Sequence, residues 1–233
     1  MTVIGASPAW PNPGGANAGH LLESDGTLLL DCGPGVLSAL RERGLYPVDA
    51  IAITHLHLDH WGDLVPWIWY ELSGLAQPRH AELWLPPGAA AELAAFGARF
   101  GYDGMFADTF DVREFETRTP FRVAGFEITA YPVEHFGMVA FGFLVRDRAG
   151  KTLAYSGDSS PCPALAELAE TADLFLCEAT LATSADDSNP RGHLAADEAL
   201  AIPARRTLLT HRPVELPAPP GAAVAVPGVT VEV

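Results

Sequence analysis

The most constraining feature of the sequence is a run of metal-ligand side chains, His-Leu-His-Leu-Asp-His, at residues 55–60. The mainly apolar run of residues 49–54 precedes it and reads as a buried strand that ends where the ligands begin. Imidazole and carboxylate groups are the side chains that zinc and similar divalent ions prefer. A histidine-rich surface turn would need neither Asp59 between the histidines nor a strand to orient them. The sequence therefore predicts a metal site at the end of a strand.

Three more side chains of the same kind occur in a similar setting. His135, Asp158 and His211 each follow a short, mainly apolar run that is typical of a strand. Alone, each would more often be an ordinary buried or surface residue than a ligand. Because the same placement recurs three times, and strand ends meet at one edge of a sheet, we expect these side chains to join residues 55–60.

This ordered set resembles the metallo-β-lactamase superfamily, whose pattern is HxHxDH, a distant His, a Gly-Asp pair and a final His. Residues 19–23 and 27–35 are also similar to the first hairpin and the Asp-x-Gly turn of that family. The resemblance covers nearly the whole chain. It implies an α/β fold of four layers, αββα, in which two mixed β-sheets pack together and helices cover both outer faces. The metals would lie in the cleft at one edge of this sandwich.

The resemblance also gives each ligand position a role and implies two divalent ions. Three residues hold the first ion, three hold the second, and one bridges the two. In this order they are His55, His57 and His135; Asp59, His60 and His211; and Asp158. Two ions about 3.5–4 Å apart repel each other, so a shared carboxylate and a bridging hydroxide reduce that repulsion, and the hydroxide is a nucleophile at neutral pH. Zinc is the first expectation, although manganese or iron also fits nitrogen and oxygen ligands.

The residue at position 57 bears on the class of reaction. Flavin-linked di-iron members of the superfamily carry a carboxylate where His57 stands, so a first site made only of histidines indicates hydrolysis. The thioester-hydrolysing glyoxalase II branch has the full ligand set, however. The ligands alone therefore predict a hydrolase without identifying its substrate.

A glutamate and a histidine outside the ligand set favour phosphodiester hydrolysis. Residues 173–178 read as a buried strand that ends in Glu178, and His193 follows fifteen residues later at the start of an expected helix. The pair resembles the His-Glu-Ala-Thr motif and its partner histidine in the phosphodiesterase branch, which includes the tRNA 3′-processing endonucleases, although Cys177 replaces the first histidine. A histidine oriented by a glutamate could protonate a departing alkoxide. We count His193, Glu178 and the ligand Asp59 as catalytic; alternatively, His193 only begins a helix and Glu178 only accepts structural hydrogen bonds.

Charge and spacing indicate a small anionic substrate rather than a long nucleic acid. The tRNA-processing enzymes carry a long basic arm between the third ligand and the bridging aspartate, whereas His135 and Asp158 are only 23 residues apart. A formal net charge of −15 would repel a polyanion, and the chain has only one lysine, Lys151, to bind its phosphates. Two metal ions would still attract a small anion. The chain is therefore similar to the armless small-phosphodiesterase group, which includes atypical bacterial cyclic-nucleotide phosphodiesterases.

Two other functions remain open on the sequence alone. An acyl hydrolase acting on lactones or thioesters would use the same metals without needing His193. A protein that binds metal or a metabolite without turnover would also fill all seven ligand positions, since a filled site does not establish catalysis.

The motifs run from residue 19 to residue 211, so we expect one domain over residues 1–233. No apolar run approaches the roughly eighteen residues of a membrane span, and we expect no membrane partner. The start lacks a secretory signal and the three cysteines are scattered, which favours a reducing cytoplasm. Helices are expected at residues 35–43, 62–73, 89–99, 163–170 and 194–202.

Two segments bear on the cleft. Residues 184–192 have no hydrophobic period and lie directly before His193, so we expect a mobile segment over the cleft that delivers this histidine. After the metal-ligand run, an apolar stripe recurs at helical spacing and is typical of core; its residues are Trp61, Leu64, Val65, Ile68 and Leu72. Trp67 and Trp69 lie off that stripe and would line either the cleft or a homodimer contact.

Overall fold

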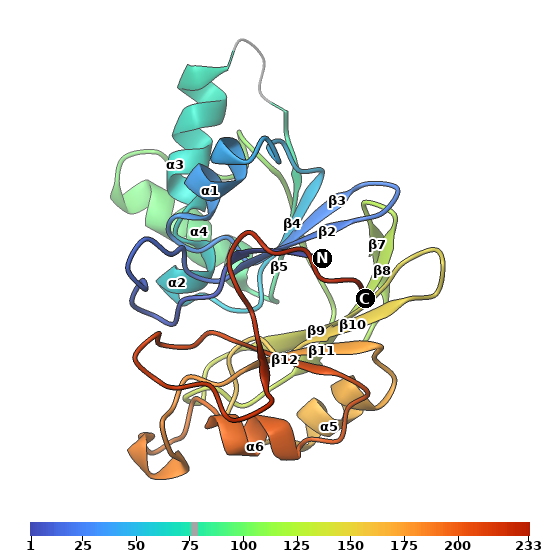
Figure 1. Cartoon of the computed structure of the whole chain (residues 1–233). Coiled ribbons are helices and arrows are strands. Elements are labelled where there is room, and N and C mark those ends of the chain that lie inside the picture. Colours follow the sequence, from blue (N-terminus) through green and yellow to red (C-terminus); the bar gives the residue numbers. More distant parts are fainter. Residues whose placement is uncertain (76–78) are drawn as a thin grey trace.

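A computed structural model describes residues 1–75 and 79–233 of the chain. Two mixed β-sheets lie face to face, and helices cover both outer faces (Figure 1). The first sheet contains, in spatial order, β1 (Thr2–Gly5), β2 (Gly19–Glu23), β3 (Thr27–Leu30), β4 (Ala50–Ala52), β5 (Glu82–Leu85) and β6 (Asp111–Glu114). The second contains β13 (Ala223–Val224), β12 (Thr207–Thr210), β11 (Leu174–Glu178), β10 (Thr152–Tyr155), β9 (Phe141–Arg146), β8 (Phe126–Pro132) and β7 (Phe121–Val123). The expected four-layer α/β sandwich is confirmed.

The helices divide between the two outer faces. They are α1 (Val36–Glu42), α2 (Leu58–Trp61), α3 (Leu64–Trp69), α4 (Ala89–Arg99), α5 (Pro163–Glu170) and α6 (Ala196–Ala201). Helices α1, α3 and α4 share a hydrophobic cluster with the first sheet, while α5 and α6 share another with the second sheet (Figure 1). Within the described residues, no helix has the length and apolar character needed to cross a membrane.

The strands read as continuous apolar runs because both of their faces are buried. Leu28 and Leu30 of β3 point into the cluster between the sheets, whereas Leu29 points to the helix layer. In β11, Leu176 faces the other sheet and Phe175 faces the helices α5 and α6. Alternation of side chains along each strand therefore produces three stacked hydrophobic cores, and none of the predicted metal ligands is part of them.

The expected helix at residues 62–73 is present from Leu64 onward, with its last turn π-helical, and one prediction about it was wrong. Helix α2 ends at Trp61, α3 follows separately, and a π-helical turn occupies Tyr70–Gly74. Trp67 lies one turn after Leu64 on the buried face of α3. It is 1% exposed and packs against Tyr46 and Phe110. Trp67 therefore lines neither the cleft nor a surface, whereas Trp69 is exposed and its contact stays a prediction. The core assignment of the apolar stripe is confirmed.

Both sheets send loops to the same end of the sandwich. The parallel strands β10, β11 and β12 have their carboxyl ends at one edge. The two sheets meet there, because Phe141 at the start of β9 donates a backbone hydrogen bond to Thr54 after β4. In Figure 1 the dark-blue loop before β2, the orange segment before α6 and the dark-red segment after β12 gather on the left, opposite the hairpin turns.

Candidate metal centre

The structure brings all seven predicted ligands together at the loop end of the sandwich. They follow β4, β8, β10 and β12, as the sequence predicted. They form two groups whose ligand atoms lie within 4.8 Å of one another: His55, His57 and His135; and Asp59, His60, Asp158 and His211. Every member except His57 is almost fully buried.

Asp158 lies between the two groups. Its Oδ2 atom is 3.2 Å from Nε2 of His60 and 3.6 Å from Nε2 of His211, and it is 4.0 Å from Nε2 of His135 in the other group. The preceding Gly157 has a φ of 58°, and a Cβ at this position would collide with a carbonyl oxygen of β9. Only glycine allows this sharp turn, which aims the carboxylate at both groups.

Four of the ligand histidines are oriented by a hydrogen bond at Nδ1. This bond leaves Nε2 directed toward the cluster, which is the usual arrangement of a metal-binding imidazole. The oxygen partners are Thr54 Oγ1 for His55 at 3.1 Å, Asp31 Oδ2 for His60 at 2.8 Å, the Gly192 carbonyl for His135 at 2.6 Å and Thr180 Oγ1 for His211 at 2.9 Å.

Asp31 is a functional residue that the sequence reasoning missed. Besides His60, its buried carboxylate accepts hydrogen bonds from the Tyr155 hydroxyl at 2.8 Å and from the backbone N–H of Thr54 at 2.8 Å. Asp31 has a φ of 60°, an uncommon conformation for a residue with a side chain. Its position in the Asp-x-Gly turn after β3 was a usable signal, whereas Tyr155 could not be told from a core residue.

We expect Asp31→Asn to weaken metal binding by about 10- to 100-fold, the usual effect of losing an outer hydrogen-bond partner of a ligand. The asparagine amide has no negative charge. It therefore no longer favours the tautomer of His60 that carries its proton on Nδ1 and leaves Nε2 free for a metal. Metal affinity is measured by competition with a chelator of known affinity. Asp49→Asn is the control, because Asp49 is also a hydrogen-bond acceptor but sits at an exposed turn against Thr27. Equal affinities of the two variants would contradict the role of Asp31.

The chemistry of the cluster fits divalent cations. Three buried atoms that face it, Nε2 of His55, Nε2 of His60 and Oδ1 of Asp158, have no hydrogen-bond partner among the described residues. A buried polar atom without a partner lowers the stability of the folded protein, and a bound metal ion would give these three atoms a partner. The ion pairs that the described residues form with Asp59 and Asp158 are all with histidines, so neither carboxylate has a lysine or arginine to neutralise it.

The titration behaviour of the histidines agrees with this fit. Burial lowers the pKa of His55, His57 and His135, so these rings are neutral, which is the form that binds metal. Burial also opposes a charge on His60, but the neighbouring carboxylates of Asp158 and Asp31 outweigh it and raise the pKa of this ring well above its usual value. The negative charge gathered at the second group thus attracts a positive charge, which a bound cation would supply.

Glu178 and His193 meet at the edge of the cluster. Nδ1 of His193 lies 2.8 Å from Glu178 Oε1 and 3.9 Å from Asp158 Oδ2. Glu178 is fully buried at the end of β11, and the backbone N–H groups of Ser159 and Thr180 hold its two oxygens. The expectation that His193 opens a helix was wrong. Helix α6 begins only at Ala196, because the preceding residues are extended and form a bridge to the segment after β11.

His193 is the more exposed member of the pair. Its side chain is 14% exposed, while that of Glu178 is 0% exposed. Burial disfavours the imidazolium, but the hydrogen bond and the charge of Glu178 outweigh this effect and raise the pKa of His193 to about 9. A protonated imidazole at this position faces both the cluster and the cleft, so it can donate a proton to a group bound there.

The loop at residues 184–192 is organised around Asp187. Its carboxylate accepts hydrogen bonds from the backbone N–H groups of Gly192 at 2.9 Å and His193 at 3.0 Å, and Arg191 pairs with it at 3.4 Å. Asp187 therefore fixes the backbone that carries His193. The mobility of this loop and its closure over the cleft stay predictions.

The sequence matches the family model described as "Beta-lactamase superfamily domain" over residues 27–212. The chain belongs to this family, and its fold and membership make it a metal-dependent hydrolase. It is 33% identical to the uncharacterised protein ML1173 of Mycobacterium leprae over 225 residues, which is 91% of this chain and 77% of that protein. It is 34% identical to the ribonuclease Z of Mycobacterium marinum over 187 residues, which is 72% of this chain and 66% of that enzyme.

Among solved structures, the metallo-β-lactamase fold protein YhfI of Bacillus subtilis superposes with a TM-score of 0.77 at 27% identity. The match covers 91% of this chain and 85% of YhfI. The predicted resemblance to the metallo-β-lactamase superfamily is therefore confirmed, and hydrolysis is established as the class of reaction.

Proposed function

We propose that this protein is a phosphodiesterase that hydrolyses a small phosphodiester, such as a cyclic nucleotide, with two divalent ions, of which zinc is the first choice. The observation that carries the proposal is the contact of 2.8 Å between His193 and the buried Glu178, at the edge of the ligand cluster. The similarity to ribonuclease Z, at 34% identity, supports the same class of bond.

Each residue of the site has a place in this reaction. When bound, a pair of divalent ions supplies a nucleophilic water of lowered pKa and stabilises charge on the phosphoryl oxygens. His55, His57 and His135 would hold one ion; Asp59, His60 and His211 would hold the other; and Asp158 would bridge them. His193 donates its proton to the oxygen that leaves phosphorus, and Glu178 keeps the ring oriented and charged.

The substrate is proposed to be small because the chain has no room for a basic arm after the third ligand. Residues 136–157, all of which the structure describes, are occupied by the hairpin of β9 and β10 and the turns beside it. The net charge of −15 opposes binding of a polyanion.

A substrate screen tests the proposal directly. Protein reconstituted with zinc, manganese or iron is offered cyclic nucleotides, bis-p-nitrophenyl phosphate, lactones and thioesters. We expect turnover of the phosphodiesters and slower turnover of the acyl substrates. Faster turnover of lactones or thioesters would make the protein an acyl hydrolase, and turnover of none of them with two bound ions would favour a binding role.

Transfer RNA is expected to bind weakly, with a Kd above about 10 µM at physiological salt, because few cationic side chains can displace counterions from its phosphates. The affinity is measured by fluorescence anisotropy with a labelled tRNA. The same measurement at low salt is the control, since residual electrostatic binding strengthens as salt falls. A submicromolar Kd at physiological salt would overturn the assignment to small substrates.

A further inference from the structure

A cavity of about 600 Å³ opens directly beside His193. Its wall is mainly apolar and includes Trp10, Phe136, Leu181, Pro213 and Leu216. These residues come from four loops far apart in the sequence, and the hydrogen bonds of Asn12 to the backbone of residues 212 and 214 join the first loop to the last. An apolar cavity of this size next to a polar reaction centre is the usual form of a site for a small organic ligand.

Phe136 is held in the wall of this cavity at a conformational cost. Its φ is 49°, which is uncommon for a residue with a bulky side chain. A Cβ at residue 192 would collide with the Phe136 ring, so Gly192 is needed opposite it. The ring lies 4.6 Å from His135 and 5.3 Å from His193 between centroids, yet remains 36% exposed. Strained backbone that presents an aromatic ring at a reaction centre points to a function for that ring.

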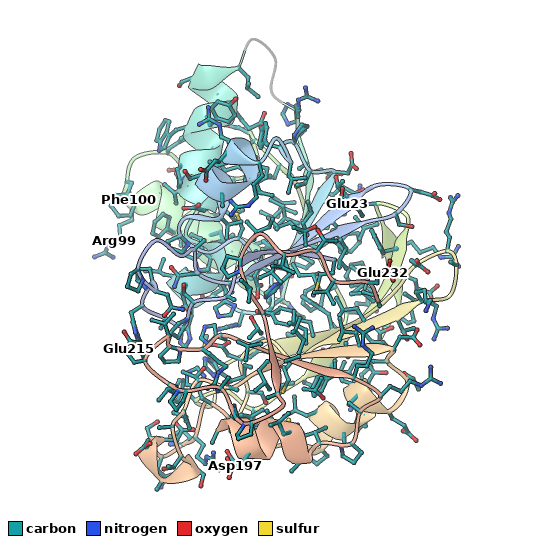
Figure 2. All side chains as sticks on the ribbon, in the orientation of Figure 1. Glu23, Arg99, Phe100, Asp197, Glu215 and Glu232 are labelled. Carbon is teal, nitrogen blue, oxygen red and sulfur yellow. The ribbon has the colours of Figure 1, made fainter. Side chains whose placement is uncertain are left out.

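The charges around the cavity limit what can enter it. Asp186, Asp187 and Glu215 line it, and no lysine or arginine is among its lining residues. Figure 2 labels Glu215 at the left edge of the molecule, on the segment after β12. The side chain of Asp187 is almost fully buried and paired with Arg191, and His193 is the one basic side chain among the described lining residues. The exposed carboxylates of Asp186 and Glu215 would repel a second phosphate away from His193, whereas they would not repel a neutral planar group. The phosphate itself therefore belongs at the ligand cluster and a neutral aromatic group belongs in the cavity.

We propose that this cavity binds the nucleobase of a nucleoside phosphodiester, with Phe136 as the surface on which the base stacks and Trp10 as a second aromatic contact. The inference rests on the proposed phosphodiesterase function and adds the substrate class and its orientation. In a 3′,5′-cyclic nucleotide the leaving oxygen stays on the ribose that carries the base. A base beside His193 therefore brings that oxygen to the proton donor.

The test compares two substrates that differ only in the base, cyclic AMP and the abasic 3′,5′-cyclic ribose phosphate. Loss of a stacking surface weakens binding by about tenfold or more, so Phe136→Leu should raise KM for cyclic AMP by about that factor and leave KM for the abasic compound unchanged. Phe136→Tyr keeps the ring and should restore the lower KM. Phe100→Leu is the control, because Phe100 is 71% exposed and lies outside the cavity. Equal changes in KM for both substrates would overturn the proposal.

A binding measurement separates this inference from the proposed function. Adenosine, which has no phosphate, should quench tryptophan fluorescence, and Trp10→Leu should remove that quenching, while ribose should have no effect. Metal content is measured in each variant, and Trp10→Leu, which leaves the ligand loops intact, stands in for Phe136→Leu if the latter loses its ions. Adenosine binding without any phosphodiester turnover would contradict the proposed function but keep the cavity as a base site. Turnover of cyclic AMP without adenosine binding would overturn the base site alone.

Discussion

Asp158→Ala is expected to remove most of the bound metal and to lower turnover by about 1,000-fold or more. The carboxylate reaches ligands of both groups, so its loss weakens two sites at once. The expected factor follows because bound metal supplies several kcal/mol of transition-state stabilisation, and each 1.36 kcal/mol corresponds to a factor of ten in rate. Metal content is measured by mass spectrometry after dialysis, with close to two ions per chain expected for the unaltered protein.

Asp63→Asn is the matched control for this experiment. Asp63 is also a buried aspartate, but its carboxylate accepts a hydrogen bond from the backbone of α1 and belongs to neither ligand group. This variant should keep two ions per chain. Saturation of the unaltered protein at one ion, or loss of a single ion from Asp158→Ala, would show that Asp158 is not a bridge.

His193→Ala is expected to lower turnover of a phosphodiester with a poor leaving group by about 100- to 10,000-fold, the usual contribution of a general acid. An ester that releases p-nitrophenolate should be affected far less, because this leaving group departs without a proton. The measurement is kcat for a pair of methyl phosphodiesters, one with an alkyl leaving group and one with p-nitrophenol. Metal content is recorded for every preparation.

Two variants complete this comparison. Glu178→Gln should give a smaller loss with the same dependence on the leaving group, because the amide still contacts His193 but no longer favours its charge. His80→Ala, which removes an exposed histidine outside the ligand groups, should have no effect. Equal losses on both esters after His193→Ala would assign His193 a positioning role instead of proton donation.

Much of the site could be predicted because its signals are local in sequence. Each ligand follows an apolar run that can be read as a strand, and strands of a sandwich end at shared edges. The bounds of α4 and α5 were also predicted correctly, since Ala89–Arg99 shows helical periodicity and Pro163 is compatible with the first turn of a helix.

The parts that escaped prediction depend on contacts between distant segments. The hydroxyl of Tyr155 meets Asp31 across 124 positions of sequence, and a buried tyrosine on a strand looks like any other core residue. Trp67 shares the buried face of α3 with Leu64 and Ile68, and the narrower stripe of apolar residues read from the sequence left it out. The cavity beside His193 was not foreseen because four loops build it and none of them has a periodic pattern.

The hydrogen bond of 3.1 Å between His211 and Asp59 joins residues 152 positions apart. During translation, residues 55–60 leave the ribosome long before β12 exists, so the second group of ligands is incomplete until His211 has been synthesised. The three apolar clusters contain none of the ligand side chains, so we expect them to assemble without ions. We therefore expect metal capture to be a late event on an already folded protein. A cell short of metal would then accumulate a finished apoprotein that can be activated when the ions return.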